Sequence, residues 1–260
     1  MSTFLFDKIV FGPVKSRRLG VSLGINLLPG SSKVCNFNCI YCECGWTPGP
    51  EVKDRKLPSR EEVYKALGRK LASMKAKGRV PDVITYAGNG EPTLHPEFGG
   101  IIEDSIKLRN RFCPRTRIAV LSNSTSVNRP EIREALLKVD LNILKLDSAF
   151  NLTLKIHNQP RINFKVDELI RDLELFNGEL IIQTLFLRGE YRGKKIDNTT
   201  PEEIAAWLEA LKRIRPAEVM IYTISRDTPA ESRLEKIPVA ELKRIASLVN
   251  KLGIQTSVSG

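Results

Sequence analysis

At 260 residues the chain can bury a large core, and one barrel-sized α/β domain fits it as well as two smaller domains. Its 42% hydrophobic and 27% charged residues are ordinary for a globular protein. There is no run of about 18 apolar residues and no leader pattern with a cleavage site, so we expect a cytoplasmic protein without a membrane partner. In that reducing compartment, clustered cysteines indicate metal ligands or catalytic thiols rather than disulfides.

The net charge of +11 permits attraction to polyanions such as RNA. The basic residues are scattered in small groups, and no aromatic-rich RNA-binding signature accompanies them. Charge therefore leaves a nucleic-acid substrate and a simply basic surface both open.

The first expected strand, Leu23 to Leu28, ends at Pro29-Gly30, a pair that breaks strands. Ser59-Arg-Glu-Glu62 has the spacing of a capping box and predicts a helix to about Lys77. Beyond it, short apolar strands alternate regularly with helical patterns. The expected strands span 83–87, 117–122, 141–147, 180–187 and 218–224, the helices about 98–111, 130–138, 166–176, 201–214 and 239–251, and a short last strand fits 254–258.

Such β–α units argue for a parallel sheet joined by crossover helices. Six clear units fall short of the eight in a complete TIM barrel. We therefore expect an α/β fold, a partial (β/α)₆ TIM-like barrel with parallel strands, and keep a doubly wound sheet as the alternative. Because no domain boundary, low-complexity segment or close repeat is evident, residues 1–260 are expected to form a single domain with short terminal extensions.

A cluster of cysteines follows the first expected strand, in residues 33–45. Cys35, Cys39 and Cys42 have C-x₃-C-x₂-C spacing, with Tyr41 just before the third cysteine. Thiolates in one tight loop suit an iron–sulfur cluster, which cysteine sulfurs bind directly. Three such ligands on a four-iron cluster would leave one iron open to a ligand that is not protein.

Polar residues after the strands are further candidates, because ligands of parallel α/β folds gather at the C-terminal ends of strands. Gly88-Asn-Gly-Glu-Pro-Thr-Leu94 follows the second strand. Its glycines allow a close approach of the backbone, and Glu91 offers an acceptor that could hold an ammonium group. An ordinary tight turn is the equal alternative.

The fourth expected strand carries two charges, Lys145 and Asp147, which share one face because they lie two residues apart. Leu144 and Leu146 would then face the helices. Charges within an apolar strand need partners when buried. Lys145 and Asp147 could pair as structural ions or bind ribose or substrate.

Other strands offer weaker candidates. Ser122 and Asn123 end the third strand with hydrogen-bonding groups, and Gln183 interrupts the apolar run of the fifth. Arg226, after the sixth strand, could bind a carboxylate or phosphate, although a solvent-exposed loop arginine is the plainer interpretation. The sequence contains no two-histidine metal motif, P-loop or nucleophile elbow.

The three cysteines with Tyr41 resemble the signature of the radical S-adenosylmethionine superfamily. The Gly88–Leu94 turn is similar to that superfamily's turn for the methionine amine, and the β–α alternation resembles its partial barrel through most of the chain. The resemblance implies a [4Fe–4S] cluster whose open iron binds the amino and carboxylate groups of S-adenosylmethionine. It also implies an enzyme that cleaves this cofactor reductively to a 5′-deoxyadenosyl radical, supplied with electrons by an external donor such as flavodoxin or ferredoxin.

Carried over by position, the resemblance makes Cys35, Cys39 and Cys42 the iron ligands and places Tyr41 beside adenine. Asn89, Gly90 and Glu91 would contact the methionine end. The remaining cofactor or substrate contacts would come from Ser122, Asn123, Lys145, Asp147 and Gln183.

Within the superfamily, residues 12–20 and the Gly88–Leu94 turn resemble a group of small proteins related to wyosine-type tRNA-modifying enzymes. This implies a tRNA-base substrate, which the positive charge would suit. Those enzymes use a second cluster held by upstream cysteines, and here no cysteine precedes Cys35. The same wyosine-forming reaction is therefore not expected, and a peptide side chain or a small metabolite stays open as the substrate.

A closed zinc site formed by Cys35, Cys39, Cys42 and Cys44 is the alternative, and would make the protein a binding module. The Cys42-Glu43-Cys44 chelate is awkwardly short for it, and zinc leaves the Gly88–Leu94 turn without a role. Cys44 and Cys113 are interpreted as structural thiols, with a redox role left open.

Overall fold

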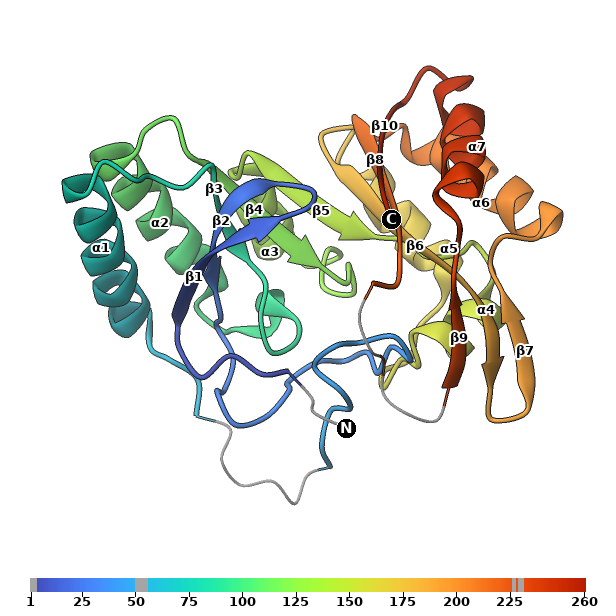
Figure 1. Ribbon diagram of the computed structural model, residues 1–260, viewed down its shortest axis with the longest axis horizontal. Coiled ribbons are helices and arrows are strands. Elements are labelled where there is room, and N and C mark those ends of the chain that lie inside the picture. Colours follow the sequence, from blue (N-terminus) through green and yellow to red (C-terminus); the bar gives the residue numbers. More distant parts are fainter. Residues whose placement is uncertain (1–3, 50–55, 226–227, 229–231) are drawn as a thin grey trace.

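The centre of the protein is an open sheet of parallel strands that run in chain order (Figure 1). The computed structural model describes residues 4–49, 56–225, 228 and 232–260. Neighbouring strands pair in the sequence β2-β3-β4-β5-β6-β8-β10, all in parallel. These strands are β2 (Gly20–Ile25), β3 (Val83–Tyr86), β4 (Arg117–Ser122), β5 (Leu141–Lys145), β6 (Ile181–Tyr191), β8 (Glu218–Thr223) and β10 (Gln255–Ser259).

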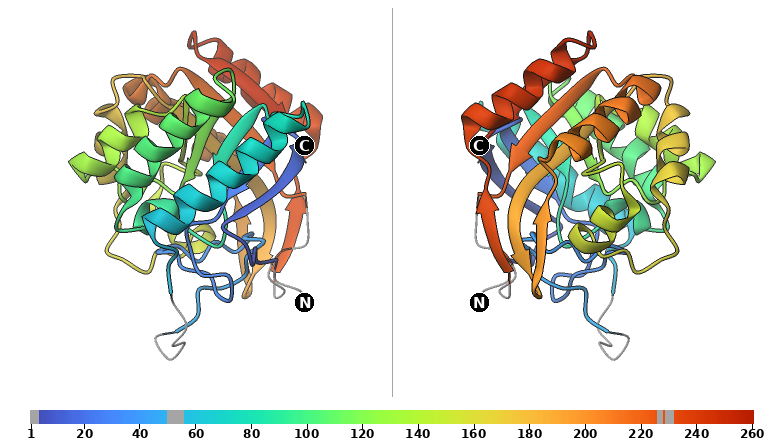
Figure 2. Two further views of the ribbon diagram at one scale, coloured as in Figure 1. Left: turned by 90° about the vertical axis from the view of Figure 1, so that its left-hand side faces the viewer. Right: turned by 90° about the vertical axis from the view of Figure 1, so that its right-hand side faces the viewer.

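Helices cover the outer face of this sheet (Figure 2). Alternate strand residues such as Ile84, Val120 and Leu144 point outward into one large core with the helices, as the two-residue period of a strand requires. The predicted capping box of Ser59 and Glu62 is present at the start of α1. The helical segments are α1 (Arg60–Ala76), η1 (Pro92–Leu94), α2 (Phe98–Phe112), α3 (Pro130–Leu137), α4 (Asn151–His157), α5 (Val166–Glu174), α6 (Pro201–Ile214) and α7 (Val239–Asn250).

The inner face of the sheet is layered. Its lowest layer is an apolar plug, formed by Leu19 from the turn before β2 and by one residue from each of the strands β3, β4, β5, β6 and β8: Val83, Ala119, Ile143, Ile181 and Met220. Several inward residues farther along the strands are polar, including Lys145 on β5 and Gln183 on β6, which pair in the strand register. The floor of the barrel is therefore closed, and its polar side opens at the C-terminal ends of the strands.

The fold confirms the predicted partial TIM-like barrel. A doubly wound sheet would reverse the strand order part-way, whereas here the order follows the chain without reversal. The short last strand is also confirmed, as β10 on the outer edge of β8. No helix among the described residues is long and apolar enough to cross a bilayer.

Three antiparallel additions were not predicted. β1 (Val10–Ser16) forms a hairpin with β2 at the first edge of the sheet. β6 runs beyond the barrel, where β7 (Lys194–Asp197) and β9 (Ser232–Lys236) pair with its two sides. The sequence hid both features. The first strand of the hairpin is largely exposed, and the extension of β6 is Arg188-Gly-Glu-Tyr191, whose polar residues look like the end of the apolar strand.

Candidate functional site

The cysteine loop (residues 33–45) lies at the open end of the barrel. It crosses from the β1–β2 side of the sheet toward the β6 side (Figure 1). Two segments hold it in place. On one side Val34 forms a parallel bridge with Gly90, with its N–H 2.8 Å from the Asn89 oxygen and its own oxygen accepting from Glu91 N–H at 3.1 Å. A Cβ on Gly90 would lie 1.9 Å from the Val34 oxygen, so only glycine permits this approach.

On the other side, the segment after α4 lies along the loop. The amide of Ile40 donates to the oxygen of His157 at 2.9 Å, and Arg161 N–H donates to the oxygen of Asn36 at 2.9 Å. Phe37 bridges to Pro160. The Gly88–Leu94 turn and residues 157–161 thus clamp the loop from two distant parts of the chain.

Hydrogen-bond donors surround the thiol sulfurs. Cys35 Sγ accepts from the backbone N–H of Phe37 at 3.4 Å and from Asn123 Nδ2 at 3.5 Å. Cys39 Sγ accepts from Asn158 Nδ2 at 3.4 Å. Such donors stabilise a thiolate over a thiol.

Lys33 places a buried positive charge beside the thiols. Its Nζ donates to the Gly45 oxygen at 2.9 Å, and it is only 3% exposed. Burial alone would lower the pKa of Lys33, but the charges of the Cys42, Cys35 and Cys39 thiolates outweigh it, and the net pKa is raised. The ammonium group therefore stays charged and favours thiolates in this loop.

The three thiols differ in acidity. A hydrogen bond from Cys44, with help from Lys33, lowers the pKa of Cys42 to about 5 against the opposing effect of burial, and the same bond raises the pKa of Cys44. Burial raises the pKa of Cys35 to about 12 and that of Cys39 above its ordinary value. Iron binding would deprotonate these two, since a metal ion reverses the local balance.

The donor set fits a cluster held by thiolates: one loop carries the sulfurs, amides point at them, and a buried cation balances their charge. Among the described residues, no group of three or more His, Cys, Asp or Glu side chains is arranged to hold a metal ion. A four-iron cluster binds its thiolates at different irons, so its ligands need not converge on a single ion. Besides its hydrogen bond to Cys42, the Cys44 thiol lies 3.4 Å from the Gly88 oxygen.

Glu91 is buried and held by donors on both carboxylate oxygens. Oε1 accepts from Ser122 Oγ at 3.0 Å and from Thr93 Oγ1 at 2.6 Å, and Oε2 accepts from the backbone N–H of Asn123 at 2.6 Å. Burial raises the pKa of Glu91 although these bonds oppose it. Ser122 and Asn123 are thus brought to the Gly88–Leu94 turn, as expected of neighbouring strand ends.

The side chain of Asn89 serves the framework instead of pointing into a cavity. Its Oδ1 accepts from Phe6 N–H at 2.8 Å, and its Nδ2 donates to the oxygens of Phe6 and Pro29 at 2.8 and 2.7 Å. These bonds tie the N-terminal segment to the turn. A contact of Asn89 with the methionine end would therefore have to use its backbone.

Tyr41, Lys145 and Asp147 meet in a buried network. The Tyr41 hydroxyl donates to Asp147 Oδ2, and Lys145 Nζ donates to the same hydroxyl at 3.1 Å and forms an ion pair with Asp147 at 3.5 Å. Burial raises the pKa of Tyr41, and it would lower that of Lys145, but the Asp147 charge outweighs it and the Lys145 pKa is raised. Leu144 and Leu146 face the helices, as predicted.

Sequence reasoning missed Asn158, which joins this network to the cysteines. Its Nδ2 lies 3.4 Å from Cys39 Sγ, 2.8 Å from the Tyr41 hydroxyl and 2.9 Å from Asp147 Oδ2. No motif marks this residue, which ends the short helix α4. Its importance shows only in the fold, where the side chain is fully buried.

Gln183 lies inside the barrel but away from the cysteines. Its Oε1 accepts from Arg18 Nη1 at 3.2 Å, and the Arg18 guanidinium lies 4.5 Å from the centre of the Tyr222 ring. Tyr222 in turn accepts from Lys145 Nζ at 3.3 Å. Arg18 is a second residue missed from the sequence. Arg226 lies outside the described residues.

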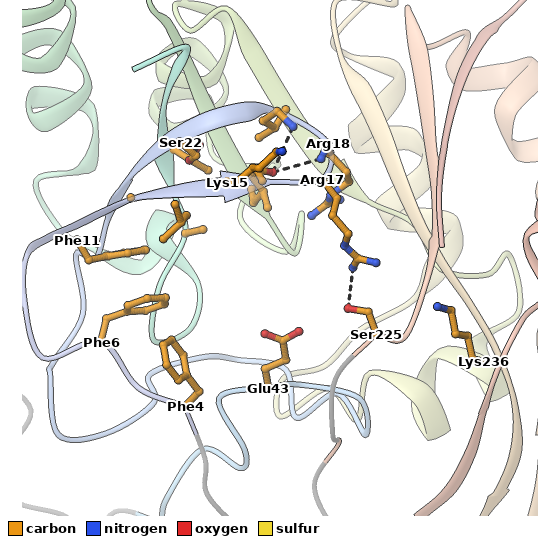
Figure 3. A pocket seen from close by; sticks show the side chains of 17 residues that line it. Phe4, Phe6, Phe11, Lys15, Arg17, Arg18, Ser22, Glu43, Ser225 and Lys236 are labelled. Carbon is orange, nitrogen blue, oxygen red and sulfur yellow. Dashed lines mark hydrogen bonds between the residues drawn. The ribbon is translucent and has the colours of Figure 1, made fainter. Parts of the chain in front are cut away.

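A cavity of about 660 Å³ occupies the barrel beside this network (Figure 3). The β1–β2 hairpin supplies one wall, and the inner faces of β2 to β4 contribute Ser22, Thr85 and Leu121. Glu43, from the cysteine loop, and Ser225, after β8, complete the opposite side. A smaller cavity of about 110 Å³ shares Arg17, Arg18, Glu43 and Ser225 and reaches Tyr41 and Tyr222, so the space extends toward the cysteine loop.

Residues 31–190 match the family model of the radical SAM superfamily. The chain belongs to that superfamily. It is 30% identical over 248 residues to a UPF0026 protein of Methanocaldococcus jannaschii, covering 94% of this chain and 72% of that protein. It is 34% identical over 236 residues to a UPF0026 protein of Synechocystis, covering 87% and 79%.

Solved structures share the fold. A radical SAM methyltransferase from Sphaerobacter thermophilus aligns with a TM-score of 0.67 at 15% identity, covering 92% of this chain and 65% of the other. Streptococcus suis SuiB, bound to S-adenosylmethionine, aligns with a TM-score of 0.60 at 15% identity, covering 92% and 47%. The chain thus spans 65% or less of these solved proteins, and such low identity shows the fold alone.

Superfamily membership makes the protein an enzyme of the radical SAM reaction class. The individual cofactor contacts, the single-domain organisation and the narrower resemblance to wyosine-type enzymes stay predictions.

Proposed function

We propose that Cys35, Cys39 and Cys42 bind a [4Fe–4S] cluster and that the protein uses it to cleave S-adenosylmethionine. The observation that carries this proposal is the thiol loop clamped against the Gly88–Leu94 turn. The Lys33 charge is buried beside the thiols, and amide donors point at the sulfurs of Cys35 and Cys39. When bound, the reduced cluster supplies the electron that cleaves S-adenosylmethionine to methionine and a 5′-deoxyadenosyl radical, which abstracts hydrogen from substrate.

The protein's own contribution is positioning. Backbone carbonyl oxygens of the Gly88–Leu94 turn and the buried carboxyl group of Glu91 would favour the methionine ammonium group, while Ser122 and Asn123 hold Glu91 in place. The network of Tyr41, Lys145 and Asp147 would border the adenosine. Electrons would come from an external donor such as flavodoxin or ferredoxin.

The test is anaerobic reconstitution of the full chain. Wild-type protein should bind about four irons and form 5′-deoxyadenosine from S-adenosylmethionine under strong reductant. Cys39→Ala should lose the cluster, whereas the matched control Cys113→Ala, which alters a buried cysteine of the helix core, should keep it. Stoichiometric zinc without iron after anaerobic purification would reject the proposal in favour of the zinc alternative.

For the substrate, a tRNA base is our first candidate, supported by the net charge of +11 and the basic lining of the cavity. Binding to bulk tRNA should then fall steeply with salt. Deuterium transfer from labelled substrate pools into 5′-deoxyadenosine would separate this candidate from a peptide side chain and a small metabolite. Absence of tRNA binding at low salt would count against RNA.

A further inference from the structure

The large cavity collects positive charge on one side. Lys15, Arg17, Arg18 and Lys236 all line it, against one carboxylate, Glu43. In Figure 3 the two arginines extend from the tip of the β1–β2 hairpin, and Glu43 points toward the cavity from below. Cations gathered around one space repel each other and attract an anion into it.

The two arginines are held by groups other than Asp or Glu side chains. Arg17 donates to the Gly260 oxygen at 2.8 Å and to Ser225 Oγ at 2.6 Å. Arg18 donates to Gln183 Oε1 at 3.2 Å and lies over the Tyr222 ring. Within the described residues, no Asp or Glu side chain forms an ion pair with either guanidinium. Each is oriented, charged and left with N–H groups for a further acceptor.

The opposite wall is aromatic. The rings of Phe6 and Phe11 are stacked with centroids 3.5 Å apart, and Phe4 meets Phe6 edge-on at 4.9 Å. Gly24 makes room for this arrangement, since a Cβ there would lie 2.1 Å from the Phe11 ring. Phe4 is 54% exposed and borders the cavity, which leaves an apolar surface facing the cations.

We propose that this cavity binds the substrate through an oxyanion, a phosphate or carboxylate group, held between Arg17 and Arg18. An apolar or planar part of the same molecule packs on Phe4, Phe6 and Phe11. Guanidinium groups suit both oxyanions because their paired N–H groups match two oxygens. This inference rests on the proposed function, since it identifies the cavity as the substrate side of that site.

The test is direct binding to the reconstituted full-length protein in saturating S-adenosylmethionine, by calorimetry, with phenyl phosphate, benzoate and benzyl alcohol as probes. We expect at least one aryl anion to bind and benzyl alcohol to bind far more weakly. Arg17→Gln and Arg18→Gln should each weaken the anion roughly tenfold or more, as loss of a charge-assisted hydrogen bond predicts. Arg115→Gln, which removes one exposed arginine that does not line the cavity, is the matched control and should leave affinity unchanged.

The relative affinities of the two anions show which oxyanion the substrate carries. A preference for phenyl phosphate indicates a phosphorylated substrate, and a preference for benzoate indicates a substrate with a carboxylate group. Phe4→Ala should weaken phenyl phosphate but not inorganic phosphate, which keeps the test usable if an arginine variant misfolds. Equal affinity of all three probes, unchanged affinity in both arginine variants, or competition of the anion with S-adenosylmethionine would overturn the proposal. Because binding needs no turnover, a wild-type protein that forms no 5′-deoxyadenosine would count against the proposed function and not against the anion site.

Discussion

The approach of Gly90 to Val34 leads to a quantitative prediction, because this bridge joins the cysteine loop to the Gly88–Leu94 turn. Gly90 has φ of +136°, a region that residues with a Cβ rarely occupy, and an added Cβ would lie 1.9 Å from the Val34 oxygen. We expect Gly90→Ala to displace Val34, and with it the adjacent Cys35.

The expected loss follows from two contributions. Backbone strain at such a position costs about 1–3 kcal/mol. The two hydrogen bonds between Val34 and the turn contribute about 1 kcal/mol each. Gly90→Ala should therefore lower the free energy of unfolding by about 3–5 kcal/mol, which lowers the urea midpoint by more than about 1 M at an m-value near 3 kcal/mol/M.

Gly78→Ala provides the matched control. Gly78 also has positive φ, +64°, but nothing lies within 4 Å of its added Cβ. Its cost should stay near 1 kcal/mol, the penalty of left-handed backbone alone. Urea denaturation of both variants, with iron content measured after reconstitution, makes the comparison. Equal midpoints for Gly90→Ala and Gly78→Ala, or full iron content in Gly90→Ala, would refute the steric argument.

Three further predictions concern the surroundings of the cysteines. Asn158→Ala should retain the cluster but lower its reduction potential by on the order of 50 mV, because it removes a hydrogen bond to Cys39 Sγ. An EPR-monitored redox titration measures this potential, and an unchanged value would contradict the prediction. Burial lowers the pKa of His157 to about 4 from an ordinary 6.5. As the pH falls, this imidazole is therefore protonated in the unfolded chain before it is protonated in the native protein. The native state loses stability between about pH 6.5 and 4. His157→Leu should remove about 2 kcal/mol of the stability difference between pH 7 and pH 5, measured by urea denaturation, and an equal pH dependence in both proteins would exclude His157 as its source. Lys33→Met should slow iron incorporation at pH 7 more than at pH 9, because the thiols lose a neighbouring positive charge that favours the thiolate form. An equal slowing at both pH values would show that the charge of Lys33 is not the cause.

The sequence by itself determined the features that depend on local periodicity. Alternating strands and helices predicted the parallel barrel, the capping box predicted the start of α1, and the two-residue spacing of Lys145 and Asp147 placed both on the inner face. The β1–β2 hairpin escaped because its exposed first strand lacks an apolar pattern. These outcomes follow from steric and hydrophobic rules that act within a few residues.

Only the tertiary structure decided which distant groups meet. Asn158 contacts Cys39 across 119 positions in the chain, and Arg18 reaches Gln183 across 165. Such contacts depend on strand register and on how loops cross the end of the barrel, which no local pattern encodes. The cysteine spacing thus indicated what the loop could bind, whereas the folded chain determined which donors and charges surround it.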